Sequence, residues 1–131
     1  MRLHALLLTF PVLCVLMTFG AHAGSIRNEG TVALSENVTL DWDISGSGVF
    51  SGTGSMVLTG SLNPGSSPGW SHLFLDTTFA AGHTLIMEIA GTAIPGVDFD
   101  SILLGSGTLT LGGTLQLAFF GGFDGTSLVA G

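Results

Sequence analysis

The chain has 131 residues, enough for one domain, and it is acidic and poor in charge, with 8% charged residues and a formal net charge of −7. It contains two Arg and no Lys, so it lacks the cations with which proteins bind nucleic-acid phosphates or an anionic membrane surface. Its one cysteine, Cys14, excludes a disulfide within the chain.

Residues 1–23 have the pattern of a cleavable secretory signal peptide. A basic start is followed by a nearly continuous apolar run from Ala5 to Phe19, short for a membrane span of roughly 20 residues. Ala21-His22-Ala23 then forms a small-x-small cleavage site. We expect export and no transmembrane segment after cleavage. The alternatives are a retained N-terminal anchor and a lipoprotein modified at Cys14, which lacks the usual small residue just before it.

Cleavage after Ala23 is a testable expectation, because the apolar run and the small residues end there. N-terminal sequencing of exported protein should begin at Gly24. An intact Met1 on a membrane-bound product would contradict it.

Residues 24–131 are expected to form one all-β domain. No window shows a helical period, and apolar residues alternate with polar ones, as when Leu85, Met87 and Ile89 share one face of a strand. Turn-forming residues bound each run, in keeping with 21 glycines in the chain. We expect strands at Val38–Ile44, Val49–Phe50, Met56–Leu58, Leu73–Leu75, Thr84–Ile89, Thr108–Leu111 and Thr114–Phe119.

Two glycine-rich segments suggest tight corners between short strands. The segment from Gly46 to Gly60 is close to low complexity and suits the corners of a stacked solenoid, although no strict repeat period is visible. Gly112-Gly113 predicts either a hairpin or a glycine kink in one long strand, because Leu111 and Leu115 keep the same face in both.

Two stretches resemble the C-terminal β-solenoid region of bacterial secreted proteins of the PEP-CTERM and autotransporter-passenger type. The first is the turn sequence Leu62–Gly69. The second runs from Leu85 to Phe123 and contains Glu88-Ile89-Ala90-Gly91, Phe99-Asp100-Ser101-Ile102 and Leu111-Gly112-Gly113-Thr114-Leu115. The resemblance spans roughly residues 42–123. It implies a right-handed parallel β-helix or its sandwich-like end cap, displayed outside a bacterial cytoplasm.

The chain departs from that class after Phe123. Such proteins usually continue into another strand and an anchor or transporter barrel, whereas this sequence stops at Gly131 without a Pro-Glu-Pro motif or a basic tail. We expect a chain truncated at its C-terminus or a soluble relative.

Common catalytic arrangements are missing or badly placed. There is no Lys, no cysteine after residue 23 and no H-E-x-x-H motif. Ser71 and His72 lie in a sequence similar to a nucleophile elbow, but adjacent residues of a strand point to opposite faces. His72 and His83 lack nearby partners for a zinc site. We predict no enzyme and no cofactor.

The acidic and aromatic residues each have a functional and a structural interpretation. Asp41 and Asp43 share a strand face, and Asp98, Asp100 and Asp124 lie in glycine-rich loops. Such carboxylates can bind calcium or act in a glycosidase, or they can cap backbone N–H groups of turns. The structural interpretation is favoured. Trp42 and Trp70 could stack on a sugar ring. Asn37-Val38-Thr39 is an N-glycosylation sequon that we expect to be inert.

We therefore predict a secreted or cell-surface structural module without catalytic, cofactor-binding or metal-binding residues. Its fold would be a short right-handed parallel β-helix with a C-terminal cap, or alternatively a small β-sandwich. Alternative functions are an adhesin or glycan-binding module, which needs Trp42 and Trp70 exposed together, and a β-helix enzyme acting on polysaccharide, with Arg27 as its only basic candidate.

The expected partners are following repeats, other copies of the chain, or a cell-surface polysaccharide. The segment from Leu103 to Phe120 contains no charge and no Pro, so its strand edges lack the residues that normally prevent edge-to-edge pairing.

Overall fold

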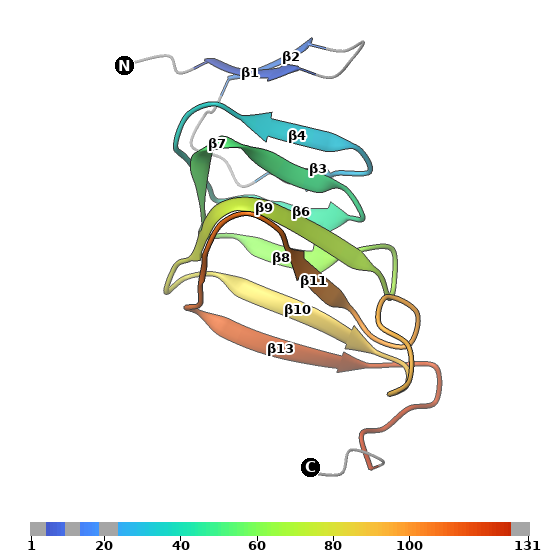
Figure 1. Cartoon of the computed structure of the whole chain (residues 1–131). Coiled ribbons are helices and arrows are strands. Elements are labelled where there is room, and N and C mark those ends of the chain that lie inside the picture. The colour runs from blue at the N-terminus through green and yellow to red at the C-terminus, as the bar shows by residue number, and fades with distance from the viewer. Residues whose placement is uncertain (1–4, 10–13, 19–23, 127–131) are drawn as a thin grey trace.

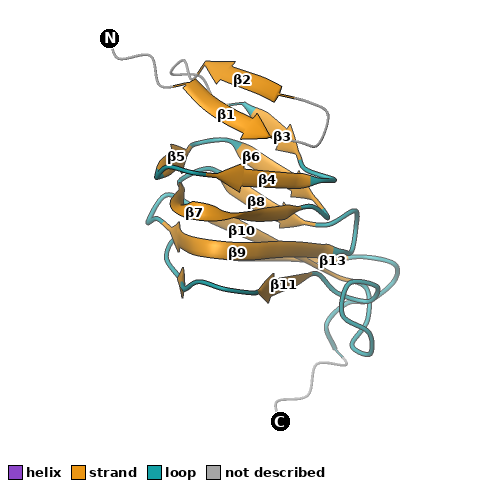
Figure 2. Ribbon diagram, turned by 45° about the horizontal axis from the view of Figure 1, so that its top comes forward, coloured by secondary structure: helices purple, strands orange, loops and turns teal. Residues whose placement is uncertain are grey.

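The structure is a computed structural model, and it describes residues 5–9, 14–18 and 24–126. The chain is all-β, as predicted, and consists of strands stacked from the N-terminal to the C-terminal end (Figures 1 and 2). The described residues contain no helix that could cross a membrane.

Two open sheets, neither closed into a barrel, make up the body of the molecule. The first sheet has the strand order β13, β10, β8, β6, β3. Its strands are β3 (Ser25–Arg27), β6 (Asp43–Gly46), β8 (Ser61–Pro64), β10 (Thr84–Ile89) and β13 (Thr114–Phe119).

The second sheet has β11, β9, β7 and β4 in order, with β12 paired to β9 and β5 paired to β7. Its strands are β4 (Thr31–Leu34), β5 (Val38–Leu40), β7 (Val49–Leu58), β9 (Trp70–Phe79), β11 (Ser101–Leu104) and β12 (Leu109–Thr110). Figure 2 shows β4, β7, β9 and β11 stacked in front of the first sheet. All pairings between the named strands of these two sheets are parallel.

Separate from both sheets, β1 (Ala5–Thr9) and β2 (Cys14–Thr18) form an antiparallel pair. This pair lies at the N-terminal end of the stack, with β1 against β4 (Figure 1). Both strands fall within the predicted signal peptide. The Ala21–Ala23 cleavage site lies outside the described residues, so cleavage there stays a prediction.

The chain passes from one sheet to the other and back, and we call each such pass a circuit. The early circuits are regular, because Asn37 bonds to Ser55 and Asp43 bonds to Ser61, each across 18 residues. The last circuit is longer, since Asp76 bonds to Thr108 across 32 residues. The 18-residue spacing is not visible as a repeat in the sequence, because the later circuits are longer.

The core lies between the two sheets and is filled by inward-facing apolar residues of successive circuits. Ile44 pairs with Leu62, and Leu62 pairs with Leu85, so residues of one type form a column across the first sheet. This stacking removes apolar surface from water at roughly 25 cal/mol per Å². The fully buried members are Leu34, Leu40, Ile44, Phe50, Met56, Leu58, Leu62, Leu73, Leu75 and Phe79.

Four strands of the two sheets, β3, β4, β8 and β11, lie outside the predicted runs, and three further details differ from the prediction. The run Val38–Ile44 is divided at Asp41-Trp42, because β5 belongs to the second sheet and β6 to the first. The runs at 49–50 and 56–58 are joined in one strand, β7, with an irregular register between Ser51 and Ser55.

The third difference concerns Gly112-Gly113, where both the predicted hairpin and the predicted single strand are wrong. The two glycines form the corner that carries the chain from β12 in the second sheet to β13 in the first. Gly113 has φ +79°, and a Cβ there would collide with the carbonyl oxygen of His83. Only glycine fits this corner without strain.

Candidate functional site

The last circuit leaves its apolar side chains exposed at one end of the stack, which we call the open end. Leu62 is 0% exposed, whereas Leu115, two places further along the same column, is 60% exposed. Leu73 is likewise 1% exposed, against 46% for Leu104, which pairs with it. These residues face inward like their buried counterparts, and among residues 24–126 no further layer of strands covers them.

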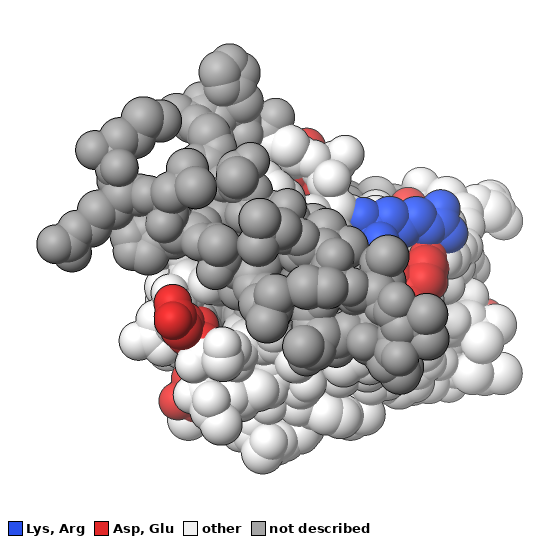
Figure 3. Space-filling view, turned by 90° about the horizontal axis from the view of Figure 1, so that it is seen from above, with Lys and Arg blue, Asp and Glu red and all other residues white. Residues whose placement is uncertain are grey.

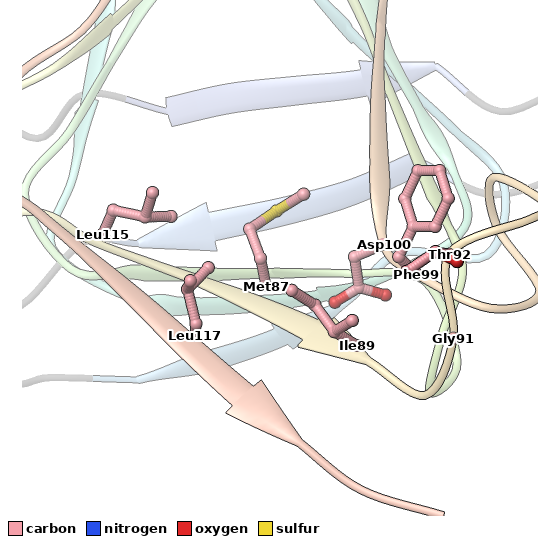
Figure 4. A pocket seen from close by; sticks show the side chains of 8 residues that line it. All are labelled: Met87, Ile89, Gly91, Thr92, Phe99, Asp100, Leu115 and Leu117. Atoms are coloured by element: carbon pink, nitrogen blue, oxygen red, sulfur yellow. The ribbon is translucent and has the colours of Figure 1, made fainter. Parts of the chain in front are cut away.

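Two cavities open on this end. One has a volume of about 400 Å³ and lies between Met87 and Ile89 of β10, Leu115 and Leu117 of β13, and the segment around Phe99 (Figure 4). The other, of about 320 Å³, lies beside the Gly112-Gly113 corner. The walls of the larger cavity are almost entirely apolar, as expected for a core whose last layer is exposed, whereas the smaller cavity has a mixed lining that includes Thr114 and the two glycines.

The strand edges at the open end are also without a partner within the described residues. β13 is the last strand of the first sheet, and β11 and β12 pair only with β9. β13 contains no charged residue and no Pro, the usual protection of an exposed edge. The strands that fall in the Leu103–Phe120 segment are therefore the last of their sheets within the described residues, and the association expected of them stays a prediction.

Asp100 lies beside the larger cavity and ties three segments together. It is 1% exposed, and its two carboxylate oxygens accept the N–H groups of Gly69 at 2.8 Å and of Glu88 at 2.7 Å. Burial raises the pKa of Asp100, and the two backbone donors oppose this shift. The carboxylate therefore caps backbone groups, as the structural interpretation of the sequence predicted.

Three of the other four candidate calcium ligands are also engaged within the protein, whereas Asp41 is exposed and lies before β6, so it does not share a strand face with Asp43 as predicted. Asp98 accepts the N–H groups of Ala93 and Ile94, and Asp124 accepts the N–H and hydroxyl of Thr126. The side chain of Asp43 accepts the hydroxyl of Ser61 at 2.6 Å. Within the described residues, no three acidic, His or Cys side chains are placed to hold a metal ion.

Chelation should accordingly leave the fold unchanged. We expect the melting temperature to be the same in EDTA and in millimolar calcium, because the carboxylates of Asp98 and Asp100 bind backbone N–H groups. Differential scanning calorimetry measures this directly. A rise in melting temperature that requires calcium would contradict the structural role of these loops.

The two histidines occupy different environments and do not form a pair. His72 stacks between Trp70 and Phe74 along β9. His83 lies in the turn between β9 and β10, is 1% exposed and packs against the ring of Phe79 at a centroid distance of 4.2 Å. Neither ring nitrogen of His83 has a hydrogen-bond partner within the described residues.

Burial lowers the pKa of His83, although the nearby backbone of Gly60 partly opposes the shift. The folded state therefore favours the neutral ring, while the unfolded chain binds a proton below about pH 6.5. This contribution to stability is present above that pH and is lost as the pH falls towards the folded pKa. The raised pKa of Asp100 acts in the opposite direction, so the two must be separated by mutation.

We expect His83→Leu to reduce the loss of stability between about pH 7.5 and 5.5, because the variant has no ring to protonate. Urea unfolding of the wild type and the variant at both pH values gives the comparison. Parallel changes in the two proteins would show that His83 does not contribute.

Ser71 and His72, the nucleophile-elbow candidate, lie on opposite faces of β9. The hydroxyl of Ser71 is buried and donates to the carbonyl of Gly46 at 3.3 Å. The ring of His72 points to the other face of β9, among aromatic neighbours. No proton can pass directly between two side chains placed on opposite faces of a strand.

The two tryptophans lie at opposite turns of the circuit. Trp42 is in the turn from β5 of the second sheet to β6 of the first, and Trp70 begins β9 after the return from the first sheet. Both are half-buried. They do not form one shared platform on which a sugar could stack.

Arg27, the basic candidate for an enzyme, is paired at the surface. Its Nε lies 2.6 Å from Oε1 of Glu29, and its Nη2 donates to the hydroxyl of Ser66. The ion pair and the Ser66 hydroxyl lower the pKa of Glu29, together with a bond from the N–H of Ser47. Figure 3 shows basic atoms beside acidic ones at the rim of the N-terminal end, at the other end of the stack from the open end.

Two buried polar residues, Asn28 and Thr77, are not among those singled out from the sequence, and Asn28 joins two circuits. It is 5% exposed, accepts the N–H of Gly30 at 3.0 Å and donates to the carbonyl of Val49 at 3.2 Å. The asparagine of the sequon, Asn37, similarly accepts the N–H of Ser55. Both side chains join neighbouring circuits, and only a search for the 18-residue spacing could have found the second.

Comparison with protein-family models, with curated proteins and with solved structures gives no match. The resemblance to PEP-CTERM and autotransporter-type solenoids therefore stays a prediction.

Proposed function

We propose that the chain is a non-catalytic structural module of a secreted or cell-surface protein, built as a short right-handed parallel β-helix. The observation that carries the proposal is the open end, where Leu115 is 60% exposed although Leu62 in the same column is 0% exposed. A module of this kind extends by stacking further β-structure on that end. Its location outside the cytoplasm rests on the predicted signal peptide.

The topology supports a β-helix over a sandwich of antiparallel strands. The chain alternates between two sheets, and each strand pairs in parallel with the strand one circuit away. Crossover connections between parallel strands of one sheet are right-handed in about 98% of cases, which supports the proposed hand. The predicted C-terminal cap is not provided by the described residues, because residues 101–126 leave the core uncovered.

The proposal that the open end is an exposed apolar surface can be tested by dye binding and by self-association. We expect the purified chain to bind an apolar fluorescent dye and to associate more strongly at high salt, which screens the negative charge over roughly 8–10 Å. The double variant Leu115→Gln/Leu117→Gln should lose most of both properties and keep its circular dichroism spectrum, because both side chains are exposed.

The matched control is Ile94→Gln/Val97→Gln, which changes two exposed apolar residues of the loop between β10 and β11. This variant should behave like the wild type. Equal losses in the two variants would show general surface stickiness and would contradict an open end with a specific role.

A further inference from the structure

We propose that the open end binds a second copy of this chain, with β13 of one molecule antiparallel to β13 of the other about a two-fold axis. The inference rests on the proposed function, since it names the partner of the open end. It extends the first sheet across the junction and covers the apolar side chains of both molecules together.

Charge favours a second copy at this place. The sequence from Ser101 to Phe123 contains no charged residue, whereas the earlier strands carry exposed carboxylates such as Asp43 and Asp76. Two acidic molecules that meet at this end therefore bring no carboxylate of these strands together. A partner recognised by its charge would find no opposite charge between Ser101 and Phe123.

The edge of β13 is self-complementary in an antiparallel pair. Rotation about a two-fold axis sets two identical edges against each other with their N–H and C=O groups facing. Residues opposite each other in such a pair point to the same face. Leu115, Leu117 and Phe119 of β13 face inward in register with Leu85, Met87 and Ile89, so inward residues must lie opposite inward residues.

One register covers all three inward side chains. If Leu117 lies on the axis opposite Leu117 of the other copy, then Leu115 lies opposite Phe119. A register centred on Gln116 would instead place Phe119 opposite Gly113, so that no side chain of the other copy faces its ring. The geometry therefore points to Leu117 as the central residue.

The same axis brings the second sheets together. β11 pairs with the beginning of β9 and β12 with its end, so a two-fold rotation sets β11 of one copy opposite β12 of the other. Leu104, at the end of β11, then gains apolar neighbours across the junction. Because each copy uses its open end once, the assembly closes as a dimer.

Cysteine cross-linking of the full chain in a Cys14→Ser background tests the register. Under mild oxidation, Leu117→Cys should give a disulfide-linked dimer as the main product, because directly opposite Cβ atoms lie about 4.5–5.5 Å apart in an antiparallel pair. Gln116→Cys, the neighbouring residue on the outward face, should give at least fivefold less. Sedimentation of the wild type should show a monomer–dimer equilibrium that Leu115→Gln/Leu117→Gln abolishes.

Efficient linkage through Gln116→Cys, or equal linkage through both positions, would overturn the proposed pairing. Long polymers of the wild type would overturn the two-fold closure and indicate head-to-tail stacking. A monomer at every concentration that still binds the apolar dye would overturn the dimer and leave the open end itself intact. A monomer that also fails to bind the dye would contradict the proposed function.

Discussion

Gly113→Val is expected to destabilise the protein more than any other single substitution considered above. A non-glycine residue at φ +79° costs of order 1–3 kcal/mol, and the added Cβ would collide with the backbone oxygen of His83. The corner cannot move away freely, because the N–H of Thr114 donates to that same oxygen at 2.8 Å. We expect a loss of about 3 kcal/mol in the free energy of unfolding, measured by urea denaturation.

Gly122→Val separates the two causes. Gly122 has φ +84°, but a side chain there would meet no atom within 4 Å. The control therefore carries the conformational cost without the collision, and it should destabilise clearly less than Gly113→Val. Equal losses of stability in the two variants would mean that the backbone at residue 113 relaxes. The close contact with His83 would then not be the reason for a glycine at this position.

The fold class could be predicted because alternation is a local signal. Leu85, Met87 and Ile89 alternate over a single strand, and β10 forms where the pattern predicted it, from Thr84 to Ile89. The assignment of strands to sheets is not local. Nothing in the run Val38–Ile44 shows that Asp41-Trp42 is a corner, because the division depends on what β5 and β6 contact one circuit away.

The 18-residue repeat of the early circuits is found in polar contacts between circuits and not in a repeated sequence. Glu29, Asn37 and Asp43 each bond to a serine 18 residues later. These pairs need only an acceptor and a donor at equal spacing, so the letters between them vary freely and no sequence repeat is seen. The role of Asp100 is likewise not visible in its local sequence, because its carboxylate binds N–H groups of β10 and of the turn before β9.

Asp100→Asn is expected to destabilise the protein by about 1–3 kcal/mol, the cost of leaving a buried donor unsatisfied. An aspartate accepts both N–H groups, whereas an asparagine has one acceptor oxygen and must turn its amide nitrogen towards the N–H of Gly69 or of Glu88. Removing the charge relieves part of the desolvation that raises the pKa of Asp100, but it leaves only one oxygen to accept the two N–H groups. The loss should still be smaller than that of Gly113→Val.

Asp124→Asn is the matched control, because Asp124 is exposed and its carboxylate accepts the N–H and hydroxyl of Thr126, two residues along the chain. Water can replace those contacts, so the urea midpoint should stay close to that of the wild type. Amide hydrogen exchange adds a local readout, since Asp100→Asn should speed the exchange of Gly69 and Glu88 while Asp124→Asn leaves both protected. If Asp100→Asn keeps the wild-type midpoint and the protection of both amides, Asp100 does not hold the last circuit against β9 and β10, and its burial then has another cause.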